Sequence, residues 1–228
     1  MKRTLVALLV GIALTPALMA GPLQVTTIGG AGYGPFQTGT GGEFTFSPSA
    51  NFLWVLNKGY VDGVTKNLPG LPNTFQTFCV EEAEFVYPNT TFDVTISNKS
   101  IFTNVSLTLG AAWLYHQFQT GQLANYDYTN RPAAQIQALQ TAIWYFMGVA
   151  PDPGAGNVFR NLGIANGGFA LNTTIPVAVL NLWAPGQVGT TAGARQDMLV
   201  CVPDGGLTLM LLGIGVGSLA LISRRLRA

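Results

Sequence analysis

Two apolar segments at the ends of the chain restrict the folded part to the residues between them. Residues 1–20 start with Met1-Lys2-Arg3, continue as an apolar run over 4–14 and end in small residues at Ala20. This order is typical of a secretory signal peptide, with cleavage expected after Ala20, and it predicts a protein that folds outside the cytoplasm. Residues 207–222 are apolar without interruption, and an arginine-rich tail follows them. This pattern predicts a single C-terminal transmembrane helix with its basic tail in the cytoplasm.

The part between the two ends is acidic and poor in charge. Five of the 11 basic residues lie in the end segments, so residues 21–206 keep six basic residues against all 10 acidic ones. A nucleic-acid binder needs clustered lysine and arginine to displace counterions from phosphates. The composition therefore argues against nucleic acid as a partner.

The central part predicts a single α+β domain over residues 43–201, a β-rich sandwich or barrel with a small helical portion. We expect the Gly-rich residues 21–42 to form a flexible leader or a loosely packed first strand. Strand composition occurs over 43–47, 75–80, 92–96, 175–183 and 196–202. Helical periodicity covers 107–118 and 132–147, with Gly121 and Gly148 as stop signals, and a short helix is expected over 157–164.

A short proline-containing motif stands before the C-terminal apolar run. Its residues are Val202, Pro203, Asp204, Gly205 and Gly206. The motif, the apolar helix rich in small residues and the terminal arginine cluster resemble the PEP-CTERM family of sorting signals, in its Val-Pro-Asp variant. The resemblance implies an exosortase-type membrane protease as partner, which cuts near the motif. The domain would then pass from the inner membrane to the cell surface or to an extracellular polysaccharide matrix. The alternative is an uncut tail anchor.

Few side chains suit metal or acid–base chemistry. The chain has one histidine, His116, and two cysteines, Cys79 and Cys201, too few for the usual zinc or transition-metal sets. The sequence therefore predicts neither a metal nor another cofactor. Three glutamates cluster at positions 81, 82 and 84, where a charge run beside a strand predicts a solvated edge; an acid–base pair is the alternative.

One glutamine lies on the apolar face of a predicted helix, where a polar side chain is not expected. With about 100° per residue, Gln140 falls within about 40° of the middle of the apolar arc of the 132–147 helix. Leaving such a buried carboxamide without hydrogen bonds costs about 1–3 kcal/mol. Either neighbouring main-chain groups bind it, or a cysteine attacks its carbonyl carbon, expels ammonia and leaves a thioester.

Two short motifs resemble the thioester domains of bacterial surface adhesins. Residues 78–81 read FCVE around the cysteine, and residues 139–144 read LQTAIW around the glutamine. The resemblance implies a β-rich fold with a helical portion and an intramolecular thioester between Cys79 and Gln140. It further implies one-time covalent capture of an amine- or hydroxyl-bearing surface or polysaccharide partner, without enzymatic turnover. The residues expected to support the thioester are Phe78, Glu81, Ile143 and Trp144.

The same residues allow two other interpretations of the function. In the first, the chain is an inert anchored matrix or carbohydrate-binding protein without a thioester, with a Cys79–Cys201 disulfide or free thiols. Its candidate sugar-stacking side chains are Trp54, Tyr60, Trp113 and Trp183. In the second, the protein is a cysteine hydrolase in which Cys79 is the nucleophile and His116 is the base.

Overall fold

The computed structural model describes residues 23–28, 34–39, 41–57, 66–68 and 70–202. The expected signal peptide, the C-terminal apolar segment and positions 203–206 of the sorting motif lie outside these ranges. Within them, no helix has the length and apolar character needed to cross a membrane. The strands are β1 (Gln24–Thr27), β2 (Gln37–Thr38), β3 (Gly41–Gly42), β4 (Phe44–Pro48), β5 (Lys66–Leu68), β6 (Leu71–Thr77), β7 (Thr91–Ser97), β8 (Val177–Trp183) and β9 (Met198–Cys201). The helices are α1 (Ala50–Asn57), α2 (Leu109–Gln119), α3 (Ala133–Phe146), α4 (Val158–Ala165) and the short 3₁₀ helix η1 (Thr191–Gly193).

Seven of the strands form one antiparallel sheet in the order β5-β6-β4-β1-β7-β8-β9, and β2 pairs with β3 separately. The sheet curls back on itself. Residues just after β6 pair with β9, through the bridge Cys79–Met198 and through main-chain bonds from Leu199 to Phe78 and from Val80 to Asp197. The α+β expectation is therefore confirmed. The place where residues 78–80 pair with β9 is called the seam of the sheet, and Cys79 lies in it.

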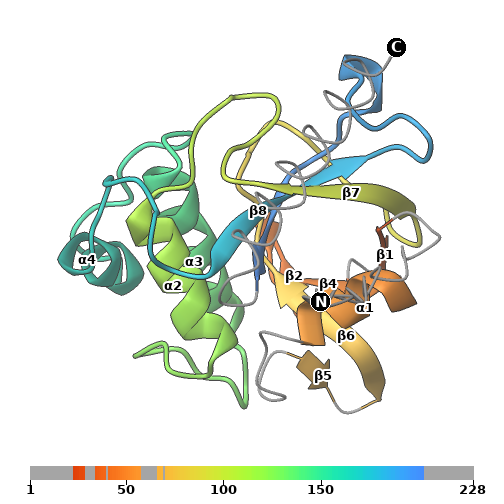
Figure 1. Cartoon of the computed structure of the whole chain (residues 1–228). Helices are drawn as coiled ribbons and strands as arrows, with labels where there is room; N and C mark the ends of the chain where they lie inside the picture. The colour runs from red at the N-terminus through yellow and green to blue at the C-terminus, as the bar shows by residue number, and fades with distance from the viewer. Residues whose placement is uncertain (1–22, 29–33, 40, 58–65, 69, 203–228) are drawn as a thin grey trace, which may run out of the picture.

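Two hydrophobic cores share the sheet. The helix-side core lies between the sheet and α2, α3 and α4, which gather on one side of the molecule in Figure 1. The sheet-side core includes side chains from all the main strands and from α1. Strand β8 is buried along its whole length because its side chains alternate between the two cores: Val177 and Val179 join the helix-side core, and Ala178 and Leu180 join the sheet-side core.

The predicted helices are confirmed to within two residues at their ends, and local capping explains where they start and stop. The side chain of Thr108 accepts a hydrogen bond from the N–H of Ala111 at the start of α2, and Asn157 does the same for Arg160 at the start of α4. Gly121 and Gly148 follow α2 and α3 with φ of 72° and 69°, a left-handed conformation that glycine adopts without strain.

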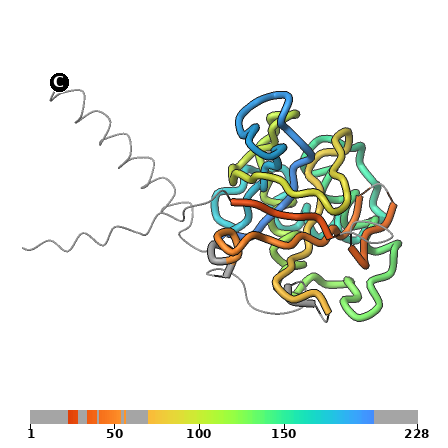
Figure 2. The backbone as a smooth tube through the Cα atoms, turned by 90° about the vertical axis from the view of Figure 1, so that its right-hand side faces the viewer, coloured from red at the N-terminus to blue at the C-terminus, as the bar shows by residue number. Residues whose placement is uncertain are grey.

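Of the two alternatives expected for residues 21–42, a flexible leader or a loosely packed first strand, the described part matches the strand, although it is well packed. Strand β1 lies in the middle of the sheet, between β4 and β7, as the red segment in Figure 2 shows. Val25 is completely buried, and β3 packs on α3. The segment belongs to the domain because main-chain hydrogen bonds on both sides of β1 hold it in the sheet. The domain therefore starts before residue 43.

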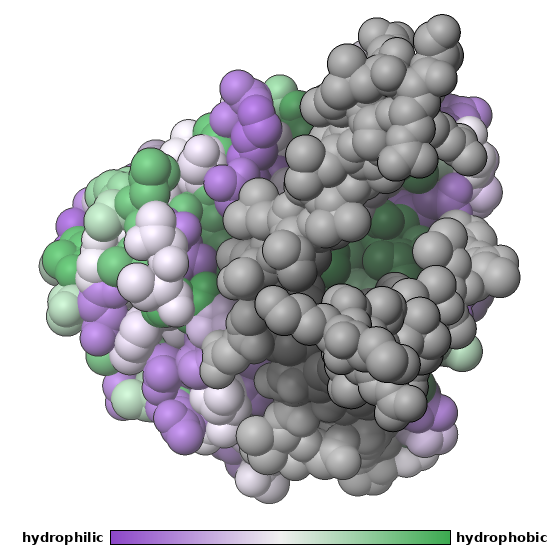
Figure 3. Space-filling view, in the orientation of Figure 1, coloured by the Kyte–Doolittle hydropathy of each residue, from purple (hydrophilic) through white to green (hydrophobic). Residues whose placement is uncertain are grey.

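Hydrophobic side chains also reach the surface at the helical end of the molecule (Figure 3). Ile164, Phe169 and Leu171 are among the exposed large hydrophobic residues of the described chain. The ring of Phe169 nevertheless packs against Tyr145, with 4.9 Å between ring centroids, and against Phe146. Phe169 therefore covers the outer face of α3 and helps to fix that helix.

Candidate functional site

The structure brings Cys79 and Gln140 into direct contact across 61 positions of sequence. The Nε2 of Gln140 donates a hydrogen bond to the carbonyl oxygen of Cys79 over 2.8 Å, and its Oε1 accepts one from the Cys79 N–H over 3.1 Å. Both residues are completely buried. The carboxamide on the apolar face of α3 is therefore held against the main chain of the cysteine.

The seam of the sheet and the periodicity of α3 explain this placement. Because Cys79 pairs with Met198, its side chain lies in the sheet-side core, whereas its neighbour Phe78 lies in the helix-side core. On α3, Trp144 also lies in the sheet-side core, and Gln140, one turn earlier, is on the same face. Helix α3 therefore places its only buried amide against the main chain of Cys79, whose side chain belongs to the same core.

Two glycines of β3 cover the amide from the other side. A Cβ atom on Gly41 would stand 2.4 Å from Cγ and 2.9 Å from Cδ of Gln140, so only glycine fits there without displacing its neighbours. The N–H of Gly42 donates to Gln140 Oε1 over 3.1 Å, and Gly42 has a φ of 141°. Sequence reasoning missed both residues, although a Gly-Gly pair directly before a strand is a signal of close backbone approach.

The Oε1 atom of Gln140 therefore faces two main-chain donors, from Cys79 and Gly42. When a nucleophile adds to the carboxamide carbon, negative charge develops on this oxygen, and N–H groups near 3 Å stabilise it. Burial raises the pKa of the Cys79 thiol well above its ordinary value, and the charge of Glu81 adds to the rise. The buried thiol therefore keeps its proton.

The expected supporting residues divide between the two cores. Trp144 donates from Nε1 to the carbonyl oxygen of Glu81 over 3.1 Å, which ties α3 to the segment after Cys79. Phe78 and Ile143 instead lie in the helix-side core, where the ring of Phe78 packs on Phe118 with 5.0 Å between centroids. Trp144 and Glu81 therefore border the Cys79–Gln140 pair, whereas Phe78 and Ile143 fix the elements that carry it.

The alternative in which Cys79 and Cys201 form a disulfide does not match the structure. Their sulfurs are not joined. Cys79 stands opposite Met198, and Cys201 lies three residues further along β9, about 10 Å away at strand spacing. Cys201 also belongs to the helix-side core, on the other face of the sheet from Cys79. The separation of about 10 Å along the strand exceeds the Cα distance that a disulfide spans, about 7 Å at most.

The residues of the other two readings occupy ordinary structural positions where the structure describes them. Trp183 is 8% exposed, and its Nε1 donates to Thr95, while Trp113 packs against the helix-side core. Trp54 lies in α1, and Tyr60 lies outside the described residues. His116 lies in the last turn of α2 and is partly exposed, a position where a cation suits the helix dipole.

The expectation of a solvated glutamate edge is wrong for Glu81, which is 1% exposed. Its Oε1 accepts from the N–H of Thr103 over 3.0 Å, and its other oxygen has no hydrogen-bond partner among the described residues. Asp197 is also completely buried, and its Oδ2 accepts from the N–H of Ile101 over 2.6 Å. Burial and the charge of Glu81 raise the pKa of Asp197 to about 8.

Asp197 gives the fold a defined pH dependence. The folded chain keeps a proton on this residue that the unfolded chain releases near pH 3.8, so stability falls as the pH rises toward 8. Between pH 6 and pH 8 this loss is about 2 kcal/mol. In urea unfolding at these two pH values, Asp197→Asn should show a decline smaller by that amount. Asp152→Asn, at a surface carboxyl whose pKa the hydrogen bonds from Arg160 hold below its ordinary value, should keep the decline of the wild type. Equal declines in the wild type and in Asp197→Asn would contradict the raised pKa.

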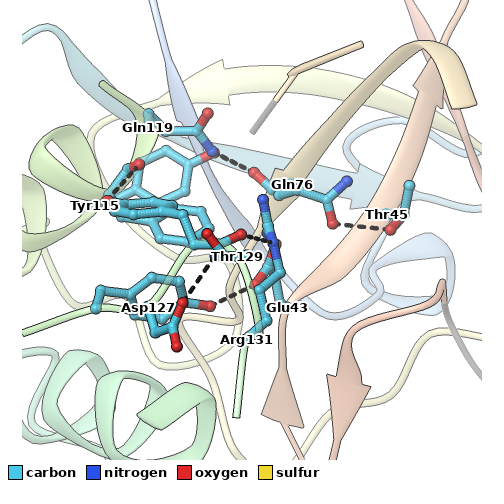
Figure 4. Close-up of polar contacts among 11 residues, drawn as sticks. Glu43, Thr45, Gln76, Tyr115, Gln119, Asp127, Thr129 and Arg131 are labelled. Carbon is cyan, nitrogen blue, oxygen red and sulfur yellow. Dashed lines mark hydrogen bonds and ion pairs between the residues drawn. The ribbon is translucent and has the colours of Figure 1, made fainter. Parts of the chain in front are cut away.

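A second buried polar network lies beside β4 and β6 (Figure 4). Glu43 is completely buried, forms an ion pair with Arg131 and accepts a hydrogen bond from the hydroxyl of Tyr126 over 2.5 Å. On the neighbouring strand, the carbonyl oxygen of Gln76 accepts from the hydroxyl of Tyr115 over 3.0 Å. This network ties the loop before α3 to the sheet, and it thereby helps to set the position of the helix that carries Gln140.

Comparison with protein-family models, curated proteins and solved structures finds no match to this chain. The function is therefore inferred from the geometry of the Cys79–Gln140 pair and from the sequence motifs.

Proposed function

We propose that this chain is an exported, surface- or matrix-anchored adhesin in which Cys79 and Gln140 form an intramolecular thioester. One observation carries the proposal: a buried glutamine amide contacts a buried cysteine, and its oxygen faces two main-chain N–H donors. In this proposal the curled sheet acts as a small barrel that holds Cys79 at its seam. The signal peptide, the membrane anchor and an exosortase-type protease would deliver the domain to the cell surface or to a polysaccharide matrix.

Thioester formation is balanced without any further reactant. The sulfur of Cys79 attacks Cδ of Gln140, and the charge that develops on Oε1 is stabilised by the N–H groups of Cys79 and Gly42. The C–Nε2 bond then breaks, and the amide nitrogen leaves as ammonia with the proton of the thiol. Because both residues are completely buried, water is kept from the acyl carbon and hydrolysis is slowed.

Capture of a partner reverses the roles of the two residues. An amine or hydroxyl attacks the acyl carbon of residue 140, the C–S bond breaks, and Cys79 leaves as a thiolate that takes up the proton of the nucleophile. The product is an amide or ester that joins the partner to α3. The reaction consumes the thioester, so each molecule reacts once and no turnover follows.

Intact mass spectrometry tests this function. The wild-type chain should weigh one ammonia less than its sequence requires, because thioester formation expels the amide nitrogen. Methylamine should add to the wild type and restore one thiol. Cys79→Ala should have the full sequence mass and take up no methylamine, because it lacks the sulfur.

Cys201→Ala is the matched control, because Cys201 lies in the other core and is not joined to Cys79. This variant should still show the loss of ammonia and the uptake of methylamine. A wild-type mass without any deficit, with two thiols alkylated after unfolding, would contradict the thioester. That result would leave the inert anchored matrix protein as the better account.

A further inference from the structure

We propose that the paired strands β2 and β3 form a lid over Gln140, which opens to admit the nucleophile of the partner. This inference rests on the proposed thioester and adds the regulation of that site. Cys79 and Gln140 are completely buried, so a partner amine reaches the acyl carbon only after part of their cover has moved. The part of the cover with the fewest attachments to the domain opens at the lowest cost in free energy.

Three parts of the described chain enclose the amide of Gln140. Helix α3 carries the amide and is fixed by the helix-side core, and the seam at Cys79 is fixed by main-chain bonds to β9. Strands β2 and β3 form the third wall and pair with each other, separately from the seven-stranded sheet. A Cβ atom on Gly41 would stand 2.4 Å from Gln140 Cγ and 2.9 Å from Cη2 of Trp144, so β3 lies directly on this face of α3. The two strands can therefore leave α3 while the ladder of the large sheet stays intact.

Gly42 is the hinge of the lid. It ends β3 just before β4 starts at Phe44, and its φ of 141° is a backbone conformation that residues with a side chain rarely adopt. Rotation about Gly42 carries Gly41 away from Gln140 and breaks the hydrogen bond from the Gly42 N–H to Gln140 Oε1. The N–H of Cys79 still donates to that oxygen when the lid is open. One donor to the developing negative charge is therefore kept during capture.

Phe36 is the latch at the other end of the lid. It stands directly before β2, and its half-buried ring packs against the helix-side core. The guanidinium carbon of Arg131 lies 4.3 Å from the centroid of this ring, a cation–π contact. Arg131 is itself held by its ion pair with the buried Glu43. The ring of Phe36 therefore closes the lid onto a fixed cation, through a contact that breaks without disturbing the sheet.

Amide hydrogen exchange of the Cys79→Ala chain, followed residue by residue by NMR, tests the lid without a thioester. The N–H of Gly42 should exchange at least about tenfold faster than that of Phe46, which lies in β4 between two paired strands. Gly41→Ala should speed the exchange of Gly42 about tenfold further and leave Phe46 unchanged, because its Cβ pushes the lid off α3. Gly156→Ala is the matched control, because a Cβ atom there has no neighbour within 4 Å, and it should change neither rate.

Methylamine uptake tests the role of the lid in capture. Phe36→Ala removes the ring that closes the lid, so the lid is open for a larger fraction of the time. Uptake by this variant should be about tenfold faster than uptake by the wild type, in proportion to the open fraction. Phe169→Ala removes another ring that packs on α3, against Tyr145, and should leave the rate unchanged.

The outcomes separate the lid from the thioester. Exchange of Gly42 as slow as that of Phe46, in the parent and in Gly41→Ala, would overturn the lid. Equal rates of methylamine uptake in the wild type and in Phe36→Ala would overturn its role in capture. The mass deficit of the wild type is measured separately, and hydrogen exchange is followed in a chain that cannot form the bond. Failure of the lid and failure of the thioester are therefore distinguishable.

Discussion

Arg131→Met should lower the free energy of unfolding by about 3–5 kcal/mol, because it leaves a buried carboxylate without its cation. Glu43 is completely buried, and its ion-pair partner Arg131 is 7% exposed. After the substitution, the hydroxyl of Tyr126 is the remaining described donor to Glu43. Methionine keeps much of the aliphatic volume, so the loss reports the missing charge. Urea unfolding at neutral pH measures this difference.

An exposed ion pair supplies the matched control for this prediction. Arg160 donates two hydrogen bonds to Asp152 at the surface, at 3.0 and 2.6 Å. Arg160→Met should therefore cost far less than Arg131→Met, because water solvates the carboxylate that remains. The double variant Glu43→Gln/Arg131→Met should recover most of the loss, because it removes both buried charges. A loss in Arg131→Met no larger than that in Arg160→Met would contradict a buried ion pair.

The apolar period of two helices and the composition of the strands predicted most elements after residue 43, but not helix α1. Helices α2 and α3 were found because their apolar residues recur at helical spacing and a glycine follows each of them, and α4 was expected as a short helix after a loop rich in proline and glycine. Strand β1 was expected only as one of two alternatives for residues 21–42, because four residues, QVTT, are too few to show alternation. Its place in the sheet comes from pairing with β4 and β7, which no local pattern encodes.

The candidate site was only partly visible in the sequence. Gln140 was found because a polar residue on an apolar helical face is a local contradiction that needs a partner. The contribution of Gly42 was not visible, because its bond to Gln140 joins positions 98 residues apart. Glu81 was expected at a solvated edge because it stands next to other glutamates. Its burial depends on Thr103 and on the neighbouring strand β9, which only the closure of the sheet brings near.

Gln140→Glu should abolish the thioester and make the fold strongly sensitive to pH. A carboxylic acid has no amide nitrogen to expel as ammonia, so neither the mass deficit nor methylamine uptake should occur. In the structure, Nε2 donates to the carbonyl oxygen of Cys79, and Oε1 accepts from the N–H groups of Cys79 and Gly42. A protonated carboxyl group reproduces this pattern, because its O–H replaces the N–H donor. An ionised one places a negative oxygen against a carbonyl oxygen in a dry core.

The sign of the pH effect follows from this difference. The folded state favours the protonated acid, so burial raises the pKa of the introduced carboxyl above its ordinary value of about 4.3. Stability is then retained below about pH 4 and falls as the pH rises, by about 3–4 kcal/mol at pH 7. Urea unfolding should be compared in the Cys79→Ala background, with Gln140 as the reference, so that a thioester crosslink does not enter the comparison. Equal stability of the two chains at pH 4 and at pH 7 would mean that water reaches residue 140. The dry site that the thioester requires would then be absent.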